Sequence, residues 1–305
     1  KYMELGAFEL TIARFTIQLD GLEYSKALSI PETYLRFLHT FVESEYDVHK
    51  KKAKADFEPS PILKLTLIDR SPIDPSHLGA ICLYQTEVWS LWKDQCGHLI
   101  FNFDQYTPAT TVVIEPDFSA GKVLRDRRSS SNTKGFPLES LDIRIFSNWL
   151  GESGDLILHA SGVISSGMGI CFAGYSGVGK STLAAHLSDH HNLQVLGEDN
   201  LILRFLDDDY WVFGSPWHLN PAMCSPQGVP LQKLFFLTRG ADKGIKQLSP
   251  MAGATRILQT AFIPYYRPEC VEKILENIGR MAERIPFYAL SYELGEDVWE
   301  IIQNG

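Results

Sequence analysis

The sequence predicts an α/β chain with a β-rich N-terminal half and a C-terminal half in which strands and helices alternate. Three observations lead to this fold class. Short runs with an apolar residue at every second position, the period of a half-buried strand, dominate residues 1–135. Apolar residues at helical spacing are concentrated beyond that point, where a glycine-rich loop also separates a strand-like run from a helix-like run. We therefore expect two domains, residues 1–135 and 136–305.

Composition and charge exclude several other classes of protein. The 305 residues are 45% hydrophobic and 21% charged, which suits a sizeable core and argues against disorder. The chain has 28 Lys and Arg against 37 Asp and Glu, and its net charge of −9 has the wrong sign for a general nucleic-acid binder. We expect no nucleic-acid partner, although a local basic groove is compatible with this count.

The cysteines and the apolar runs favour a cytoplasmic protein without a membrane partner. No C-x-x-C pattern and no Cys/His cluster is present, so we expect neither a disulfide framework nor a zinc site. No apolar run approaches the roughly 18–20 residues that a membrane-spanning helix needs. The first residues also lack the charged and apolar regions of a signal peptide. The five scattered cysteines, expected to be reduced, are Cys82, Cys96, Cys171, Cys224 and Cys270.

In the N-terminal half, the period of two predicts a mixed, mostly antiparallel set of strands. Phe8, Leu10 and Ile12 alternate with more polar neighbours and are typical of the pattern. Turn-rich stretches at 94–97 and 104–108 separate later runs. The strands are expected at 8–12, 62–68, 80–84, 87–92, 99–103 and 111–114.

One helix and one loop complete the N-terminal half. The helix is predicted at 31–42, because proline in the first turn favours a helix start and Tyr34, Leu38 and Phe41 share a face. Residues 126–135 lack apolar periodicity and predict a linker at the domain boundary, with a basic substrate-contacting flap as the alternative.

In the C-terminal half, helical and strand-like runs alternate. Helices are predicted at 137–150, 181–189, 252–262 and 268–284, with a short one at the end of the chain. Strands are predicted at 156–158, 163–164, 168–173, 194–197, 200–205, 210–214, 233–237 and 287–293.

The glycine-rich loop carries the clearest chemical signal. It fits the pattern G-x-x-x-x-G-K-[ST] between a strand and a helix, the context in which the pattern binds phosphate. Glycines let backbone N–H groups turn towards an anion, and the following helix presents its partial positive end. We expect Lys180 to neutralise the β- and γ-phosphates and Ser181 to ligate Mg²⁺; the alternative is a purely structural turn. The predicted nucleotide-binding residues are Gly174, Tyr175, Ser176, Gly177, Val178, Gly179, Lys180, Ser181 and Thr182.

Two acids and a histidine accompany the loop. Glu198 and Asp199 follow an apolar strand, and acids at the carboxyl end of such a strand face bound phosphates. One acid could hold Mg²⁺, with Asp199 as the expected ligand, and the other could take a proton from a hydroxyl nucleophile. A solvated turn is the alternative. His159 lies on the strand before the loop strand, and its neighbours favour a role at the site over an ordinary place in the core.

Three segments together resemble the C-terminal catalytic domain of HPr kinase/phosphorylase: residues 158–163, 174–181 and 197–200. The similarity is greater to HPr-kinase-like proteins of bacterial biosynthetic clusters, including lasso-peptide kinases. Residues 235–240 and 247–250 also resemble both this group and ATP-dependent phosphoenolpyruvate carboxykinase, which shares the fold. The resemblance implies a phosphoenolpyruvate-carboxykinase-like, HPr-kinase-like P-loop domain over roughly residues 140–300, behind a β-rich N-terminal domain of unknown role.

Matched position by position, the resemblance implies that His159 is an active-site histidine and that Lys180 and Ser181 contact phosphate and metal. Glu198-Asp199 stands where the family has Asp-Asp, which supplies the base. The first acid is one methylene longer here, so the identity of the base stays open. The family's downstream metal-binding Glu motif is absent, and residues 214–220 occupy its place. This departure bears on regulation, reverse phosphorolysis and HPr as substrate more than on phosphoryl transfer.

Several other residues are weaker candidates. Lys243, Lys246 and Arg256 could each supply a cation for the transferred phosphate. Lys246 is the expected one, because it lies nearest an active-site basic residue of the carboxykinase-like group; solvated charge is the alternative. Trp217-His218 is predicted either to line the site or to pack in an ordinary loop. Residues 207–209 predict a turn between strands. Residues 265–268 predict an exposed loop, with contact to a peptide as the alternative.

These observations predict an ATP- and Mg²⁺-dependent serine kinase. Its expected acceptor is a hydroxyl of a peptide or small protein, such as a ribosomal peptide precursor. A small-metabolite kinase with the same core would need a closed pocket, whereas a peptide kinase needs an open groove. A nucleotide-binding regulator without phosphoryl transfer is the third candidate, favoured by the missing Glu motif. The sequence leaves open ATP against GTP and a monomer against a homo-oligomer.

Overall fold

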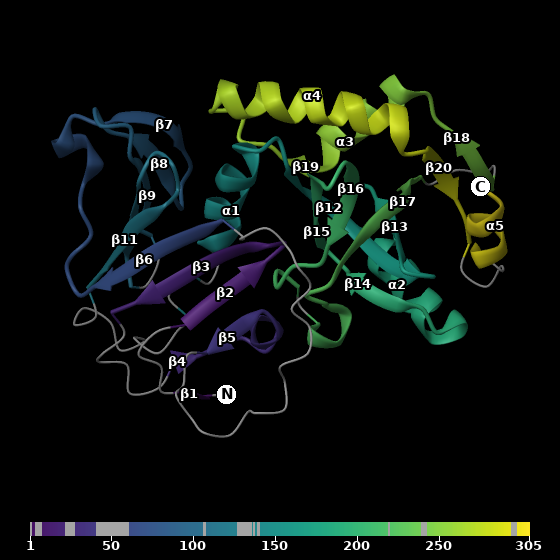
Figure 1. Cartoon of the computed structure of the whole chain (residues 1–305), viewed down its shortest axis with the longest axis horizontal. Coiled ribbons are helices and arrows are strands. Elements are labelled where there is room, and N and C mark those ends of the chain that lie inside the picture. Colours follow the sequence, from purple (N-terminus) through teal and green to yellow (C-terminus); the bar gives the residue numbers. More distant parts are fainter. Residues whose placement is uncertain are drawn as a thin grey trace. The chain divides into compact units, whose positions relative to one another are not determined.

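The computed structural model describes most of the chain and divides it into two compact units. The described residues are 2–3, 8–21, 28–40, 61–105, 108–126, 136, 138, 141–218, 220–238, 243–293 and 298–305. Unit 1 comprises residues 1–139 and unit 2 residues 140–305 (Figure 1). The linker predicted at 126–135 lies outside the described residues except for Asp126. No helix in the described part of the chain is long and apolar enough to cross a membrane.

Unit 1 is built on a mixed nine-stranded sheet, mostly antiparallel as predicted. Only the central pairs, β3 with β6 and β6 with β11, are parallel. The strand order is β5 (Leu38–Thr40), β2 (Phe8–Ile12), β3 (Phe15–Asp20), β6 (Ile62–Ile68), β11 (Ala120–Arg125), β10 (Thr110–Ile114), β9 (Leu99–Phe103), β8 (Ser90–Lys93) and β7 (Ile81–Gln85). A separate pair joins β1 (Tyr2–Met3) and β4 (Leu28–Ser29), and two 3₁₀ turns are η1 (Tyr34–Arg36) and η2 (Pro75–Leu78).

The helix predicted at 31–42 is wrong. Its first half forms only the 3₁₀ turn η1, in which the Tyr34 N–H donates to the Pro31 carbonyl at 3.0 Å. The chain then becomes extended as β5, where Leu38 pairs with Leu10 of β2. Sheet pairing thus overrides the helical pattern, since tertiary contacts outweigh weak local propensity. Residues 41–42 lie outside the described part.

The strand predicted at 87–92 begins later, at Ser90. The preceding residues form a turn in which the Thr86 N–H donates to the Trp89 carbonyl at 2.9 Å. The Thr86 hydroxyl also accepts from the Trp89 N–H at 3.1 Å, so a threonine side chain holds the backbone out of the ladder. The strands β3 and β11 have no counterpart among the predicted elements.

Unit 2 contains a second mixed sheet, flanked by helices (Figure 1). Because β17 pairs with both β16 and β13, five strands form a closed circuit. The strand order is β13 (Met168–Ala173), β12 (Leu156–Ser165), β15 (Asn200–Leu206), β16 (Asp209–Phe213), β17 (Gly228–Leu237), β20 (Phe287–Ser291) and β18 (Gly244–Gln247), with β14 (Gln194–Gly197) and β19 (Ala261–Phe262) added to β12. The helices are α1 (Asp142–Gly151), α2 (Lys180–His191), η3 (Pro221–Met223), α3 (Pro250–Thr260), α4 (Pro268–Arg284) and α5 (Val298–Asn304).

Several predicted elements of unit 2 differ in extent from the observed ones. The two short strands at 156–158 and 163–164 are one ten-residue strand, β12, because paired strands on both sides hold it extended throughout. The first helix begins at Asp142 rather than at 137, which lies outside the described residues. The helix predicted to reach residue 262 ends at Thr260, and the next two residues pair with β12.

Strand β12 separates two cores and thereby orients the site. Leu158 and Ala160 pack in one core with residues of α3 and α4. Val163 packs in a second core with residues of α2. Side chains alternate along a strand, so His159 and Ser161 lie on the same side as Val163, towards α2. A histidine inside an apolar strand is therefore directed at the glycine-rich loop.

Candidate functional site

The glycine-rich loop joins β13 to α2, as the sequence predicted. Gly177 and Gly179 have φ values of +76° and +112°, in the left-handed region that glycine favours. A Cβ on Gly179 would come within 2.9 Å of the Tyr292 hydroxyl, which donates to the Gly179 carbonyl at 3.0 Å. Nothing lies within 4 Å of a Cβ built on Gly177. The loop is therefore held from the end of β20 at one point and open at another.

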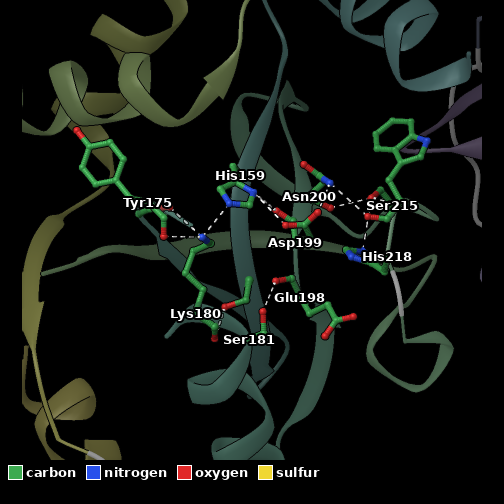
Figure 2. Close-up of polar contacts among 12 residues, drawn as sticks. His159, Tyr175, Lys180, Ser181, Glu198, Asp199, Asn200, Ser215 and His218 are labelled. Atoms are coloured by element: carbon green, nitrogen blue, oxygen red, sulfur yellow. Dashed lines mark hydrogen bonds and ion pairs between the residues drawn. The ribbon is translucent and has the colours of Figure 1, made fainter. Parts of the chain in front are cut away.

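Lys180, the first residue of α2, lies beneath the loop and is only 5% exposed. Its Nζ donates to the carbonyls of Gly174 at 2.9 Å and Tyr175 at 3.1 Å (Figure 2). A third contact, 2.9 Å long, joins the same Nζ to Nε2 of His159. Burial lowers the pKa of the Lys180 ammonium, and the charge of Asp199 opposes that shift.

His159 connects Lys180 to Asp199. An ammonium can only donate hydrogen bonds, so Nε2 of His159 must accept the hydrogen bond from Lys180, and Nδ1 then carries the ring hydrogen. Nδ1 lies 3.0 Å from Oδ1 of Asp199 and 3.1 Å from its carbonyl oxygen. The contacts thus run in one line from the ammonium through the imidazole to the carboxylate (Figure 2). The His159 hydrogen bond lowers the pKa of Asp199, burial opposes this, and the charge of Lys180 adds to the lowering.

The acids lie in a break between two strands that follow one another along β12. Gly197, at the end of β14, pairs with Gly162, and Asn200, at the start of β15, pairs with His159. Between them, the Asp199 carbonyl still accepts from the Ala160 N–H at 2.9 Å. Both strands therefore pair with β12, and this alignment places Asp199 next to Asn200, the partner of His159.

The carboxylates of the two acids point in different directions (Figure 2). Oε1 of Glu198 accepts from the Asn220 N–H at 3.0 Å, just ahead of the 3₁₀ turn η3. The backbone carbonyl of Glu198 accepts from the Ser181 hydroxyl at 3.1 Å. Asp199 instead faces His159, and its Oδ2 accepts from Nδ2 of Asn200 at 2.8 Å. The sequence left open which acid is the base, and the structure gives the two carboxylates different hydrogen-bond partners.

The segment after β16 braces the acids from behind. Nδ2 of Asn200 also donates to the Trp217 carbonyl at 3.2 Å. The Ser215 hydroxyl donates to the Asn200 carbonyl at 2.7 Å. His218 is mostly buried, and burial lowers its pKa to about 4 although the charge of Asp199 opposes the shift. His218 is therefore neutral near pH 7, and Trp217-His218 lies behind the acids.

Sequence reasoning did not single out Asn200, Ser215 or Tyr292. Asn200 directly follows the acids in the motif used for the family resemblance, which is a usable signal. Ser215 and Tyr292 contact the site from segments that carry no local motif. Only the folded chain identifies them.

Lys246 is not brought to the loop. It lies exposed on β18, opposite Ala289 of β20, and β20 and β17 separate β18 from the loop strand β13. Lys243 is paired with Glu293 at 2.7 Å, and the Arg256 guanidinium lies 5.8 Å from the centre of the Phe236 ring. No described contact joins any of the three cations to Lys180, His159 or Asp199, so their predicted role lacks geometric support.

The remaining candidate segments are resolved by their packing. Asp207 and Asp208 form the predicted turn, with positive φ at both residues. The loop predicted as exposed at 265–268 is exposed at Tyr265 and Pro268. Arg267 is buried and pairs with Glu152, which removes its charge from solvent.

Comparisons with known proteins give one family and a distant structural likeness. Residues 137–304, more than half of the chain, match the family model described as "SynChlorMet cassette protein ScmC". Among solved structures, the chain resembles one described as "Structure of the Hpr(Ser) kinase/phosphatase from Coxiella burnetii". That match has 13% sequence identity and a TM-score of 0.30, and it covers 48% of this chain and 86% of the other. No curated protein matches the sequence.

Proposed function

This chain belongs to the family of the SynChlorMet cassette protein ScmC, and we propose that it transfers a phosphoryl group from ATP to a serine hydroxyl of a peptide or small protein. One observation carries the proposal: the line of contacts from Lys180 through His159 to Asp199, directly beneath the glycine-rich loop. A phosphate-binding cation and a carboxylate able to take a proton are thus coupled through one imidazole. A nucleotide-binding turn alone would have no use for this coupling.

The residues at the loop fit the phosphates of a nucleotide and Mg²⁺. The α2 N-terminus and the positive-φ glycines would offer N–H groups to an anion, and the space at Gly177 is open. The exposed Ser181 hydroxyl gives its hydrogen to the Glu198 carbonyl, which leaves its oxygen lone pairs free for a cation. We assign Mg²⁺ to Ser181 and Asp199. When bound, the ion would neutralise charge on the phosphates, as would Lys180.

Asp199 is the proposed base as well as the proposed Mg²⁺ ligand, so both roles fall on one acid. An ionised carboxylate is required to take the proton of the acceptor hydroxyl, and the lowered pKa of Asp199 provides it at neutral pH. Such a carboxylate is a weak base, which suits a loose transition state in which the hydroxyl has lost little of its proton. His159 would keep Asp199 oriented through its Nδ1 hydrogen while its Nε2 keeps Lys180 in place.

Glu198 is the proposed positioning residue of the pair. Its carboxylate accepts a backbone N–H of the segment that braces the acids, and its carbonyl holds the Ser181 hydroxyl. The longer side chain at this position therefore has a structural reason: it reaches Asn220. This assignment gives the two acids different tasks.

A peptide acceptor is favoured over a small metabolite by the surroundings of the loop. Tyr175 is 68% exposed, and the Ser181 side chain is also exposed. A kinase for a small metabolite needs enclosure around the transferred group to exclude water. A regulator that only senses nucleotide is the other alternative, and the Lys180–His159–Asp199 line argues against it.

The test is transfer of label from γ-labelled ATP to a library of serine-containing peptides by the purified full-length chain. We expect Mg²⁺-dependent labelling of serine, lost when that serine is replaced by alanine. Lys180→Ala should abolish transfer and weaken ATP binding, because the phosphates lose their main cationic partner. Lys246→Ala is the matched control, a lysine of the same unit with no contact to the site, and it should keep the wild-type rate.

Three results would overturn parts of this assignment. Wild-type transfer by Lys180→Ala would rule out the site. Label on a small hydroxylated metabolite but on no peptide would favour the metabolite kinase. Tight binding of ATP with no transfer to any acceptor would favour the regulator, and the same assay with GTP tests the choice of nucleotide.

A further inference from the structure

One end of the sheet in unit 1 gathers side chains of the types that ligate metal ions, and these play no part in the proposed function. Lys93 of β8, Leu99 of β9 and Ile114 of β10 form the last cross-strand row of their ladders. One residue further, the same register sets Asp94, His98 and Glu115 side by side. Facing residues of neighbouring strands have side chains close enough to interact. Three potential ligands therefore meet where two turns come together.

The hairpin turn between β8 and β9 adds a thiol to this group. Cys96 lies at its tip, and ligand atoms of Asp94, Cys96 and His98 all lie within 4.8 Å of one another. The absence of a Cys/His cluster, expected from the sequence, is thus corrected: the spacing D-x-C-x-H places the three on one hairpin. Among the described residues, this is the one group of at least three His, Cys, Asp or Glu side chains so arranged.

The turn is already shaped to hold these groups. Oδ1 of Asp94 accepts from the N–H groups of both Cys96 and His98 at 2.9 Å. Gly97 has a φ of +89°, and a Cβ there would come within 3.3 Å of Pro116 on the neighbouring turn. A side chain at position 97 would therefore meet both strain and crowding. The backbone order that a metal site requires is provided before any ion binds.

Carboxylates contact both nitrogens of the His98 ring. Nδ1 lies 2.6 Å from Oδ2 of Asp94, and Nε2 lies 3.1 Å from Oε2 of Glu115. Metal-binding histidines commonly use one nitrogen as ligand and donate the other N–H to a carboxylate, which fixes the ring. In His98, Glu115 is the carboxylate partner of Nε2, and Nδ1, beside Asp94, is the nitrogen available as a ligand.

We propose that Asp94, Cys96 and His98 bind a Zn²⁺-class ion through Oδ2, Sγ and Nδ1, with Glu115 orienting the imidazole through Nε2. Thiolate and imidazole select Zn²⁺ or Co²⁺ over Mg²⁺, so this site is chemically distinct from the one assigned at Ser181. Binding replaces the proton between His98 and Asp94 and the proton of the thiol, and both are released to solvent. Water would complete a tetrahedral shell. The ion would tie the β8–β9 turn together.

A turn stabilised by Asp94 alone is the competing explanation. It accounts for the Oδ1 contacts but gives no role to the thiol of Cys96 or to Glu115. The two explanations therefore differ at Cys96, whose substitution leaves the turn's backbone contacts intact.

The test is titration of the reduced full-length protein with Co²⁺. A thiolate ligand produces a sulfur-to-cobalt charge-transfer band in the near ultraviolet. We expect this band to saturate at one ion per chain, to disappear on addition of Zn²⁺ and to persist in excess Mg²⁺. Cys96→Ser and His98→Gln should abolish it, and Glu115→Gln should weaken Co²⁺ binding about 10- to 100-fold.

Two matched variants serve as controls. Cys82→Ser removes the other exposed cysteine of unit 1 and should keep the band. His190→Gln disrupts a pair of stacked imidazoles on α2, whose ring centres lie 4.2 Å apart, and should also keep it. Circular dichroism verifies that each variant is folded. A band that survives Cys96→Ser, a band lost in Cys82→Ser, or no saturable binding by the folded wild type would each overturn the proposal.

Discussion

The pairing of β12 with β15 carries a charged group at each of its ends, and the two groups differ in a revealing way. Leu156 pairs with Leu203, and one row beyond them the Asp155 carboxylate accepts from Nε of Arg204 at 2.7 Å. At the other end, His159 pairs with Asn200, next to Asp199. At each end, an aspartate thus contacts a nitrogen-containing side chain across the strand pair: Arg204 at one end and His159 at the other.

Exposure separates the two ends. The Asp155 side chain is 2% exposed, and its second oxygen accepts from the Phe205 N–H at 3.1 Å. Burial raises the pKa of Asp155 to about 6, against the opposing charge of Arg204. The Asp199 side chain is 48% exposed, and hydrogen bonding lowers its pKa. The Asp155 carboxylate is enclosed in a buried ion pair, whereas the Asp199 carboxylate is within reach of solvent and of a bound substrate.

Conservative replacement of the two aspartates should give the largest contrast. Asp199→Asn removes the proposed base and should lower the transfer rate by on the order of 10²–10⁴-fold, with little change in melting temperature. Asp155→Asn should lower the melting temperature while the rate per folded molecule stays near wild type. Single-turnover rates and thermal melts on the same preparations measure both. Equal losses of rate in the two variants would remove the distinction between the ends.

Arg204→Met tests the buried Asp155–Arg204 ion pair by removing its cation. It leaves the Asp155 carboxylate buried without its cation, and breaking one side of a buried ion pair costs about 3–5 kcal/mol of unfolding free energy. Urea denaturation measures this cost. The double variant Arg204→Met with Asp155→Leu, which has no buried charge, should recover part of it. A loss below about 1 kcal/mol for Arg204→Met would mean that Asp155 takes up a proton in the variant or that water reaches the pair.

The buried imidazole behind Asp199 should make stability depend on pH. Burial lowers the folded-state pKa of His218 from 6.5 to about 4, so the unfolded chain binds this proton more readily between those values. The contribution of neutral His218 to the unfolding free energy is fully present above pH 6.5 and is lost as the pH falls towards 4. One pKa unit corresponds to about 1.4 kcal/mol, so the loss is on the order of 3 kcal/mol.

Comparing wild type with His218→Asn isolates this contribution. The variant does not titrate at this position, so its unfolding free energy should fall less steeply between pH 6.5 and 4. Parallel curves for the two proteins would contradict the assignment of His218 as a buried neutral group. Only the slope is read, since the variant changes packing at every pH.

The smallest effects should come from Glu198, the neighbour of the proposed base. Glu198→Gln keeps an oxygen that accepts the Asn220 N–H and should cost less than a few-fold in rate. Glu198→Ala removes that acceptor and should cost more, with a net hydrogen-bond loss of about 1 kcal/mol. Rates for the two variants, measured over a range of Mg²⁺ concentrations, separate positioning from proton transfer. A loss with Glu198→Gln as large as that with Asp199→Asn would show that Glu198 shares the proton-transfer role.

Local patterns predicted several features well. The alternation of apolar residues identified β2 and β9, and the glycine-rich loop was placed between the correct strand and helix. Glu198 and Asp199 were placed after β14, whose bounds were also correct. These features depend on neighbours within a few residues, so the sequence alone carries the information. The helix predicted at 31–42 shows the limit of local patterns, because pairing with the remote strand β2 made part of that segment extended.

The tertiary structure decided which of the candidate groups meet. Nothing local in the sequence states that His159 faces Lys180, because this depends on the register of β12 against β13 and β15. The tertiary structure also gives the side chains of Asp199 and Glu198 different neighbours and keeps Lys246 on a distant strand. The hairpin register likewise gathers Asp94, His98 and Glu115 from separate segments. Sequence determined the chemical groups and their local backbone, whereas pairing between remote strands determined their neighbours, since burial and facing partners exist only once the sheet has formed.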